Sequence, residues 1–181
     1  MGARVVAAAT ATATAALLGT AVGCSPPTGR PDLTGVKVGD CVKLGGTPDQ
    51  PEAAKAPCGS YESNFKVVAP VADARDGASC PADVDSSYSL RRSSSHAHDT
   101  ICLDIDWVVG GCMSVDPRQA ADPFRVDCDD ASVLHRQRAT EILTGLAPPV
   151  TVDLCASGQG YAYTQRRFAV CVEDADGRVG S

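Results

Sequence analysis

Two segments of the chain repeat one pattern around a cysteine. The segment VKVGDCVKL covers residues 36–44, and WVVGGCMSV covers residues 107–115. Both read apolar–x–Val–Gly–x–Cys–apolar–polar–apolar, and each begins a set of four cysteines: Cys41, Cys58, Cys80 and Cys102, then Cys112, Cys128, Cys155 and Cys171. Self-similarity of this kind is the sequence signature of a repeated structural unit, so the pattern predicts two copies of one module.

The residues around the later cysteines of each set agree as well. CPADVDSSYSLRR, which starts at Cys80, aligns with CASGQGYAYTQRR, which starts at Cys155, and ICLDID at residues 101–106 aligns with VCVEDA at residues 170–175. We therefore expect a first module at residues 36–106, a second module at residues 107–176 and a tail at residues 177–181. Because no linker separates the modules, we expect them to pack as one pseudo-symmetric body.

Alternating apolar and polar residues dominate both modules and predict strands. In residues 36–44 we expect Val36, Val38, Val42 and Leu44 on one face, and residues 101–107 and 168–173 alternate in the same way. Residues 65–72 and 135–143 occupy corresponding places, so we expect strands there too, although the second segment alone resembles a helix. A short helical turn is expected between residues 80 and 89. The prediction is a mainly β fold with little helix and about five strands per module.

Composition indicates that disulfides stabilise this fold. Aromatic residues make up only 4% of the chain, so its apolar core is thin, whereas the chain holds nine cysteines. Small domains with thin cores are commonly held by disulfides in oxidising compartments. If pairing respects the duplication, each module has three possible connectivities. Among these we favour the most local one: Cys41–Cys58, Cys80–Cys102, Cys112–Cys128 and Cys155–Cys171.

The N-terminus predicts export. Residues 1–23 contain one basic residue followed by an apolar stretch, and no acidic residue precedes Asp32, as in a secretory signal peptide. Small residues before Cys24 resemble a bacterial lipobox, in which that cysteine is lipidated, and residues 24–35 form a Pro-rich tether. A lipid anchor would hold the protein on the extracytoplasmic face of the cell membrane. The alternatives are a cleaved signal without lipidation and an uncleaved membrane anchor.

Paired arginines are the main candidate for ligand binding. Arg91–Arg92 and Arg166–Arg167 recur in register, each pair three residues after Tyr88 or Tyr163. Guanidinium groups suit carboxylates and phosphates, so these residues could hold an anionic ligand. The alternative interpretation, which we favour, is that the arginines are solvated strand residues that pair with the many aspartates.

Other kinds of chemistry have less support. The chain has no C-x-x-C motif, which a thiol–disulfide enzyme or a zinc site would be expected to have. It also has no G-x-S-x-G motif, which is typical of many hydrolases. The metal candidates are His96, His98 and Asp99, in the segment SSSHAHDT at residues 93–100 that has no counterpart in the second module. An exposed polar loop is the alternative there, and it is the interpretation that we favour. The net charge of −6 argues against nucleic acid as a partner.

Read together, a lipobox followed by VGDCVKL, SNFKVVAPVADA, ICLDIDWVVGGCMSVDP and GYAYTQRRFAVCVE resembles the LppU-like lipoproteins of mycobacteria. More distantly, the cysteine spacing is similar to septum-formation-like modules of actinobacterial envelope proteins. The resemblance implies a cell-envelope lipoprotein and no catalytic residue or cofactor. We expect a non-enzymatic binding or interaction module whose partners are the membrane, through the anchor, and an envelope protein or anionic cell-wall component. The alternatives are a small-anion-binding or metal-binding lipoprotein and, with less support, a cell-wall enzyme.

Overall fold

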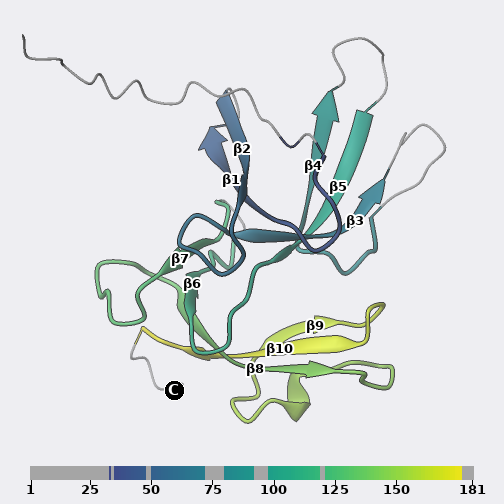
Figure 1. The fold of residues 1–181 in the computed structure, drawn as a ribbon. Helices are drawn as coiled ribbons and strands as arrows, with labels where there is room; N and C mark the ends of the chain where they lie inside the picture. The colour runs from purple at the N-terminus through teal and green to yellow at the C-terminus, as the bar shows by residue number, and fades with distance from the viewer. Residues whose placement is uncertain are drawn as a thin grey trace, which may run out of the picture.

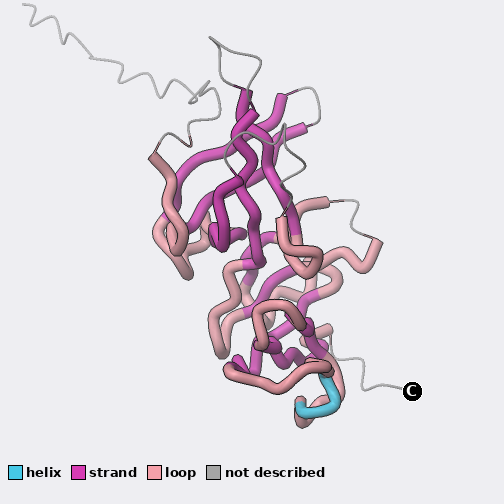
Figure 2. The backbone as a smooth tube through the Cα atoms, turned by 90° about the vertical axis from the view of Figure 1, so that its right-hand side faces the viewer, coloured by secondary structure: helices cyan, strands magenta, loops and turns pink. Residues whose placement is uncertain are grey.

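The computed structural model describes residue 33 and residues 35–47, 50–71, 80–91, 98–118 and 121–176. The predicted signal peptide and tether, Cys24 and the tail therefore lie outside the described residues, apart from the few tether residues after residue 32. The described part consists of strands joined by turns and loops with almost no helix, which confirms the mainly β prediction (Figure 1). Its one short helix is a 3-10 turn, η2, at Val152–Leu154 (Figure 2). No helix among these residues is long and apolar enough to cross a membrane.

Ten strands form two five-stranded antiparallel sheets. The first sheet has the order β2-β1-β3-β5-β4 and the second has the order β7-β6-β8-β10-β9. The strands of the first sheet are β1 (Cys41–Thr47), β2 (Gln50–Ala56), β3 (Phe65–Val71), β4 (Ser86–Arg91) and β5 (His98–Ile105). The second comprises β6 (Cys112–Ser114), β7 (Phe124–Val126), β8 (Arg136–Thr144), β9 (Gly160–Tyr163) and β10 (Phe168–Asp174).

The two sheets match strand for strand. Each strand of the first sheet has a counterpart five strands later in the chain, and the order of neighbours is the same. The irregularities match too: the pairing of β3 with β5 skips Val68, and the pairing of β8 with β10 skips Thr140, immediately after the equivalent residues Val67 and Ala139. A β-bulge at the same place in both sheets agrees with the predicted duplication.

Four disulfides staple the sheets, and all four predicted pairs are confirmed. They are Cys41–Cys58, Cys80–Cys102, Cys112–Cys128 and Cys155–Cys171. In each sheet one bridge ties the start of a central strand to the turn after the edge strand, and the other ties the segment before the opposite edge strand to a central strand. Each closes a loop of 16 to 22 residues, and loops of that length correspond to about 3 kcal/mol of chain entropy.

The buried apolar residues of both sheets form one shared cluster. Val42, Phe65, Val67 and Leu103 come from the first sheet, and side chains of the second, among them Met113, join the same cluster. Residues on the alternate face of β5 and after it, Cys102, Asp104 and Asp106, are buried as well. This face carries polar residues but is not exposed to solvent, because Arg166 and Arg125 of the second half of the chain form ion pairs with its carboxylates.

Two expectations about element boundaries are wrong. The strand expected over residues 36–44 begins only at Cys41: residues 36–40 form a turn, Gly39 has a φ of +92°, and Val38 is 59% exposed. The helical turn expected between residues 80 and 89 is a tight turn in which Val84 N–H donates to the carbonyl of Pro81, followed by β4. In both places a local turn interrupts a pattern that looked regular in sequence.

The exposed polar loop expected at residues 93–100 is wrong for the end of that segment, which belongs to a strand. β5 begins at His98, and the backbone of His98 pairs with that of Arg91 at the end of β4. The first module therefore lengthens the β4–β5 hairpin where the second has the short turn between β9 and β10.

Candidate functional site

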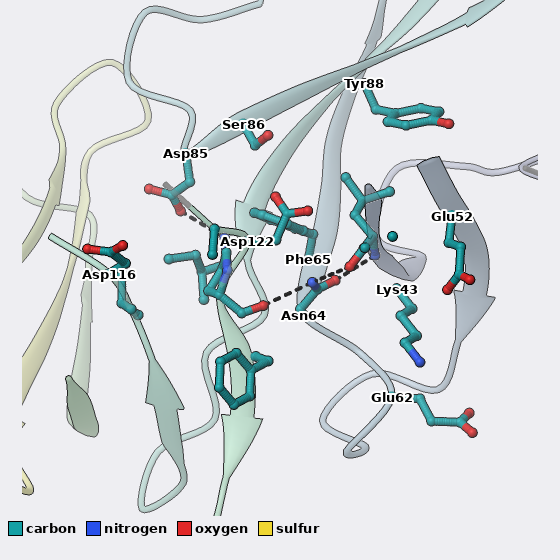
Figure 3. A pocket seen from close by; sticks show the side chains of 18 of the residues that line it. Lys43, Glu52, Glu62, Asn64, Phe65, Asp85, Ser86, Tyr88, Asp116 and Asp122 are labelled. Carbon is teal, nitrogen blue, oxygen red and sulfur yellow. Dashed lines mark hydrogen bonds between the residues drawn. The ribbon is translucent and has the colours of Figure 1, made fainter. Parts of the chain in front are cut away.

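A cleft with a volume of about 790 Å³ opens between the two sheets. Its walls are the β1–β2 hairpin, the start of β4 and the floor formed by β3 and β5, together with residues 115–116, residues 121–124 and Tyr161 from the second half of the chain. Figure 3 shows how the labelled side chains surround this space. We call it the inter-sheet cleft. Clefts of this size between packed units are typical ligand sites.

The cleft exists because β1 leaves the rest of its sheet early. β1 pairs with β2 over its whole length, but it pairs with β3 at only two positions, Cys41 with Lys66 and Val42 with Phe65. Beyond Leu44 the strand continues through Gly45 and Gly46, and Gly46 has a φ of +83°, a conformation that favours glycine. The β1–β2 hairpin thus diverges from β3 and leaves an open space.

Asn64 closes the bottom of this gap. Its side-chain amide donates to the carbonyl of Leu44 at 2.8 Å and accepts the Leu44 N–H at 2.8 Å, so it replaces the next rung of the β1–β3 ladder. The same amide donates to the carbonyl of Pro123 at 2.9 Å. Asn64 is 5% exposed. One buried side chain therefore links β1, the end of the loop before β3, and the loop that forms the opposite wall.

Aromatic residues line the cleft from both sheets. Phe65 is buried in the floor, Tyr88 and Tyr161 are half-buried, and Tyr61 and Phe124 are 66% and 49% exposed. Large exposed rings offer flat apolar faces with negative π-electron density. They can stack on an apolar ligand group or hold a cation.

Acidic residues dominate the charge of the lining. Five carboxylates face one ammonium group, that of Lys43. In the view of Figure 3, Asp85 and Asp116 lie on one side, Glu52 and Glu62 on the other, and Asp122 between them. The electrostatic potential of the cleft is therefore negative.

None of these five carboxylates has an ion-pair partner among the described residues. Outside the cleft, six carboxylates are within 4.0 Å of a basic group: Asp40, Asp83, Asp104, Asp106, Glu173 and Asp176. Others at the surface, such as Asp129 and Glu141, have no ion-pair partner among the described residues either, so the cleft is distinguished by the number of carboxylates that gather around one space.

Burial raises the pKa of two of the cleft carboxylates. Burial raises the pKa of Asp85, although hydrogen bonds from Ile105 N–H at 2.8 Å and Tyr163 O–H at 2.7 Å oppose that effect. Burial also raises the pKa of Asp122. Burial and the neighbouring Asp85 charge raise the pKa of Tyr161 to about 12, so this phenol stays neutral and donates to Gln137. The inner end of the cleft is thus the place where added negative charge is least favourable.

Among the predicted ligand residues whose side chains the structure describes, only Tyr88 lines the cleft. Arg166 instead lies between the halves of the chain: it forms ion pairs with Asp83 and Asp104, donates to the Asp83 carbonyl at 2.6 Å, and lies 4.9 Å from the Tyr163 ring centroid. Arg166 therefore takes the structural role that was the alternative interpretation.

The other arginines do not join Arg166 at one described site. Arg167 is exposed and donates to the Leu146 carbonyl at 2.9 Å. Arg92 and the side chain of Arg91 lie outside the described residues. Of the two arginines whose side chains are described, neither Arg166 nor Arg167 lines the cleft.

The predicted metal candidates cannot be placed as ligands. His96 lies outside the described residues, and only the backbones of His98 and Asp99 are described, in β5. The one described group with ligand atoms within 4.8 Å of one another is Cys41, Cys58 and Asp106. Its two sulfurs are joined in a disulfide and are not thiolate ligands.

A second cluster joins the two halves beside that disulfide. Arg125 and Asp106 form an ion pair of 3.3 Å in which both side chains are 7% exposed. The Asp106 carboxylate also accepts from Gly59 N–H and Ser63 O–H, each at 2.6 Å, and Arg125 donates to the Ser60 carbonyl. Every charge of this cluster is used in the protein's own packing, so it is structural.

The sequence contained no signal for the cleft acids. Glu52, Glu62 and Asp122 belong to no repeated motif and are far apart in the chain. Only the divergence of β1 from β3 and the packing of the second half of the chain bring them around one space.

Fold and cleft together define the class: an all-β, disulfide-stapled protein of two matching five-stranded sheets with an acidic, aromatic cleft between them. Comparison with known protein families, with curated proteins and with solved structures finds no match to the chain. The resemblance to LppU-like lipoproteins therefore stays a prediction.

Proposed function

We propose that this protein is a lipid-anchored, non-enzymatic binding module of a bacterial cell envelope, held on the outer face of the cytoplasmic membrane. Its ligand site is the inter-sheet cleft. The observation that carries the binding role is the concentration of exposed aromatic rings and uncompensated carboxylates around one volume of about 790 Å³. Exposed apolar rings and convergent polar groups around a concave space are a common mark of a binding site.

The extracytoplasmic location is supported by two independent features. Residues 1–23 have the pattern of a secretory signal, and Cys24 follows it in a lipobox-like context. The remaining eight cysteines form four disulfides, which persist in oxidising compartments and are rare in the cytosol. Two acyl chains on Cys24 would be sufficient for stable membrane attachment.

Binding is favoured over catalysis by the chemistry of the lining. The described lining contains no histidine and no cysteine, the residues that most often act as base or nucleophile. Its groups are rings, carboxylates and hydroxyls, which suit recognition. The anionic component expected from the arginine pairs is not complementary to a cleft with five carboxylates, so we do not place it there.

The experiment for this proposal is the intact mass of the protein extracted from membranes, measured with and without reduction. We expect the mass of residues 24–181 plus acyl chains and minus eight hydrogens, with a gain of eight hydrogens on reduction. The Cys24→Ala variant should lose the acyl mass and leave the membrane fraction. An unacylated wild-type chain, or free thiols before reduction, contradicts the proposal.

A further inference from the structure

We infer that the inter-sheet cleft binds an organic polycation: a ligand with two or more ammonium or guanidinium groups on an apolar chain. The inference rests on the proposed function for the site itself, and it specifies the class of ligand. Three separate observations lead to it: the charge of the cleft, its aromatic walls and the spacing of its carboxylates.

The negative charge of the cleft favours a cationic ligand. The lining has five carboxylates and one ammonium, and within the described residues none of these acids has an ion-pair partner. A ligand with several positive charges would supply the missing partners. It would also relieve the mutual repulsion of the acids, which the folded protein otherwise tolerates.

The aromatic walls select an organic cation. Tyr61 and Phe124 expose much of their rings, and Tyr88 and Tyr161 are half-buried around the same space. Ring faces attract ammonium and guanidinium groups, and they also pack against the methylene groups between those charges. A hydrated inorganic ion would use the carboxylates and leave the rings without a role.

The spacing of the carboxylates argues against a single metal ion. A divalent cation needs several oxygens converging on one point. Among the described residues, no group of three acids in the cleft has its ligand atoms within 4.8 Å of one another. The negative charge is instead distributed over opposite walls, from Glu62 to Asp116 (Figure 3). A distributed charge fits a ligand whose positive groups are separated by a chain.

The protein contains its own reporter for binding. Trp107 is the only tryptophan of the chain, and its ring centroid lies 5.2 Å from that of Tyr161, which lines the cleft. A ligand seated against Tyr161 changes the surroundings of this pair. The emission of Trp107 should therefore change with ligand concentration and reach saturation.

The test is a titration of the full-length protein, extracted from membranes in a neutral detergent, at low ionic strength. The probes are spermine and a tetralysine amide, which share ammonium chemistry and represent a small polyamine and a peptide; tetra-alanine amide and magnesium chloride serve as comparisons. Trp107 emission is one readout and calorimetry is the second. We expect saturable binding of at least one polycation, weakened by added salt, and no comparable binding of the comparison compounds.

The site is checked with a matched pair of variants. The double variant Glu62→Gln/Asp122→Asn removes one cleft carboxylate from each half of the chain. The control Asp129→Asn/Asp153→Asn makes the same change in net charge at exposed positions outside the cleft. We expect the first to weaken polycation binding at least about fivefold and the second to have little effect.

Equal weakening by both variants, or no saturable polycation signal by either readout, overturns the inference. Such a result leaves the acylated mass of the proposed lipoprotein untouched, so the two proposals fail separately. Conversely, an unacylated chain that still binds spermine in the cleft contradicts only the lipid-anchored location.

Discussion

The side-chain amide of Asn64 forms two hydrogen bonds with the backbone of Leu44 that a neighbouring strand would otherwise form. It accepts the Leu44 N–H and donates to the Leu44 carbonyl, both at 2.8 Å. Normal ladder pairing between β1 and β3 ends at Val42, two residues earlier. Because the side-chain amide replaces the hydrogen bonds of a strand pair, β1 diverges from β3 without leaving buried polar groups unpaired. The inter-sheet cleft depends on this contact.

Removing the amide should therefore destabilise the protein. Asn64→Ala leaves the N–H and carbonyl of Leu44 and the carbonyl of Pro123 without this partner in a buried place. We expect a loss of about 2 to 3 kcal/mol in the free energy of unfolding, measured by urea denaturation. Lys43→Ala, at an exposed position on the same strand, is the control and should change stability by less than about 0.5 kcal/mol. Equal stabilities of the two variants would contradict the role given to Asn64.

The buried ion pair of Arg125 and Asp106 should matter much more than an exposed one. Arg125→Met leaves the Asp106 carboxylate without its positive partner at a site where both side chains are 7% exposed, so we expect a loss of about 3 kcal/mol. Arg138→Met breaks a pair with Glu173 whose side chains are 41% and 48% exposed, and it should cost less than about 1 kcal/mol. Thermal and urea unfolding of both variants measure the difference. Similar losses would show that Arg125 is not a structural link.

The contribution of Asp104 to the stability of the protein should fall as the pH rises from about 4 to about 6. Burial raises the pKa of Asp104 from 3.8 to about 6, although Arg166 opposes the shift. A carboxyl whose pKa is higher in the folded than in the unfolded chain favours folding while it is protonated, below pH 3.8, and loses that contribution as it ionises on the way to pH 6. Burial shifts the pKa of Asp85 in the same direction.

The Asp104→Asn variant tests this dependence, because an amide does not titrate. Its free energy of unfolding should change less between pH 4 and pH 6 than that of the wild type. Asp129→Asn, at an exposed carboxyl, should keep the wild-type slope. Parallel curves for wild type and Asp104→Asn would show that Asp104 does not titrate in this window.

Equivalent disulfides of the two sheets should contribute equally to stability. Cys41–Cys58 and Cys112–Cys128 close loops with sequence separations of 17 and 16. Replacing either pair by serines should cost about 3 kcal/mol, because both release nearly the same chain entropy in the unfolded state. Unfolding of the two double variants under non-reducing conditions measures this. A difference of more than about 2 kcal/mol would mean that the matching sheets are not energetically equivalent.

Local and repeated features of the chain were predictable. The match between residues 36–44 and 107–115 indicated a duplication, and the structure has two sheets with the same strand order. The repeat also identified β8 as a strand, although its sequence alone resembles a helix. The disulfide pairing followed because short loops and a duplicated pattern leave few alternatives. In each case the information lies in the spacing of residues along the chain.

The direction in which a polar side chain points was not predictable in the same way. Arg166 and Tyr88 both belong to the repeated motif, yet Arg166 is held by Asp83 and Asp104 of the other half of the chain, whereas Tyr88 lines the cleft. Val38 also follows the apolar alternation and is nevertheless exposed, since a turn at Gly39 rotates it outward.

Spacing along the chain thus predicted the β class, the repeated module and a favoured disulfide pairing among three per module, because alternation and cysteine spacing can be read from the chain before it is folded. The acidic cleft was decided by tertiary structure alone. Glu52, Asp85 and Asp122 come together only because β1 leaves β3 after two pairs and the loop before β7 packs against the gap. Contacts of that kind depend on how one half of the chain covers the other, which no spacing along the chain encodes.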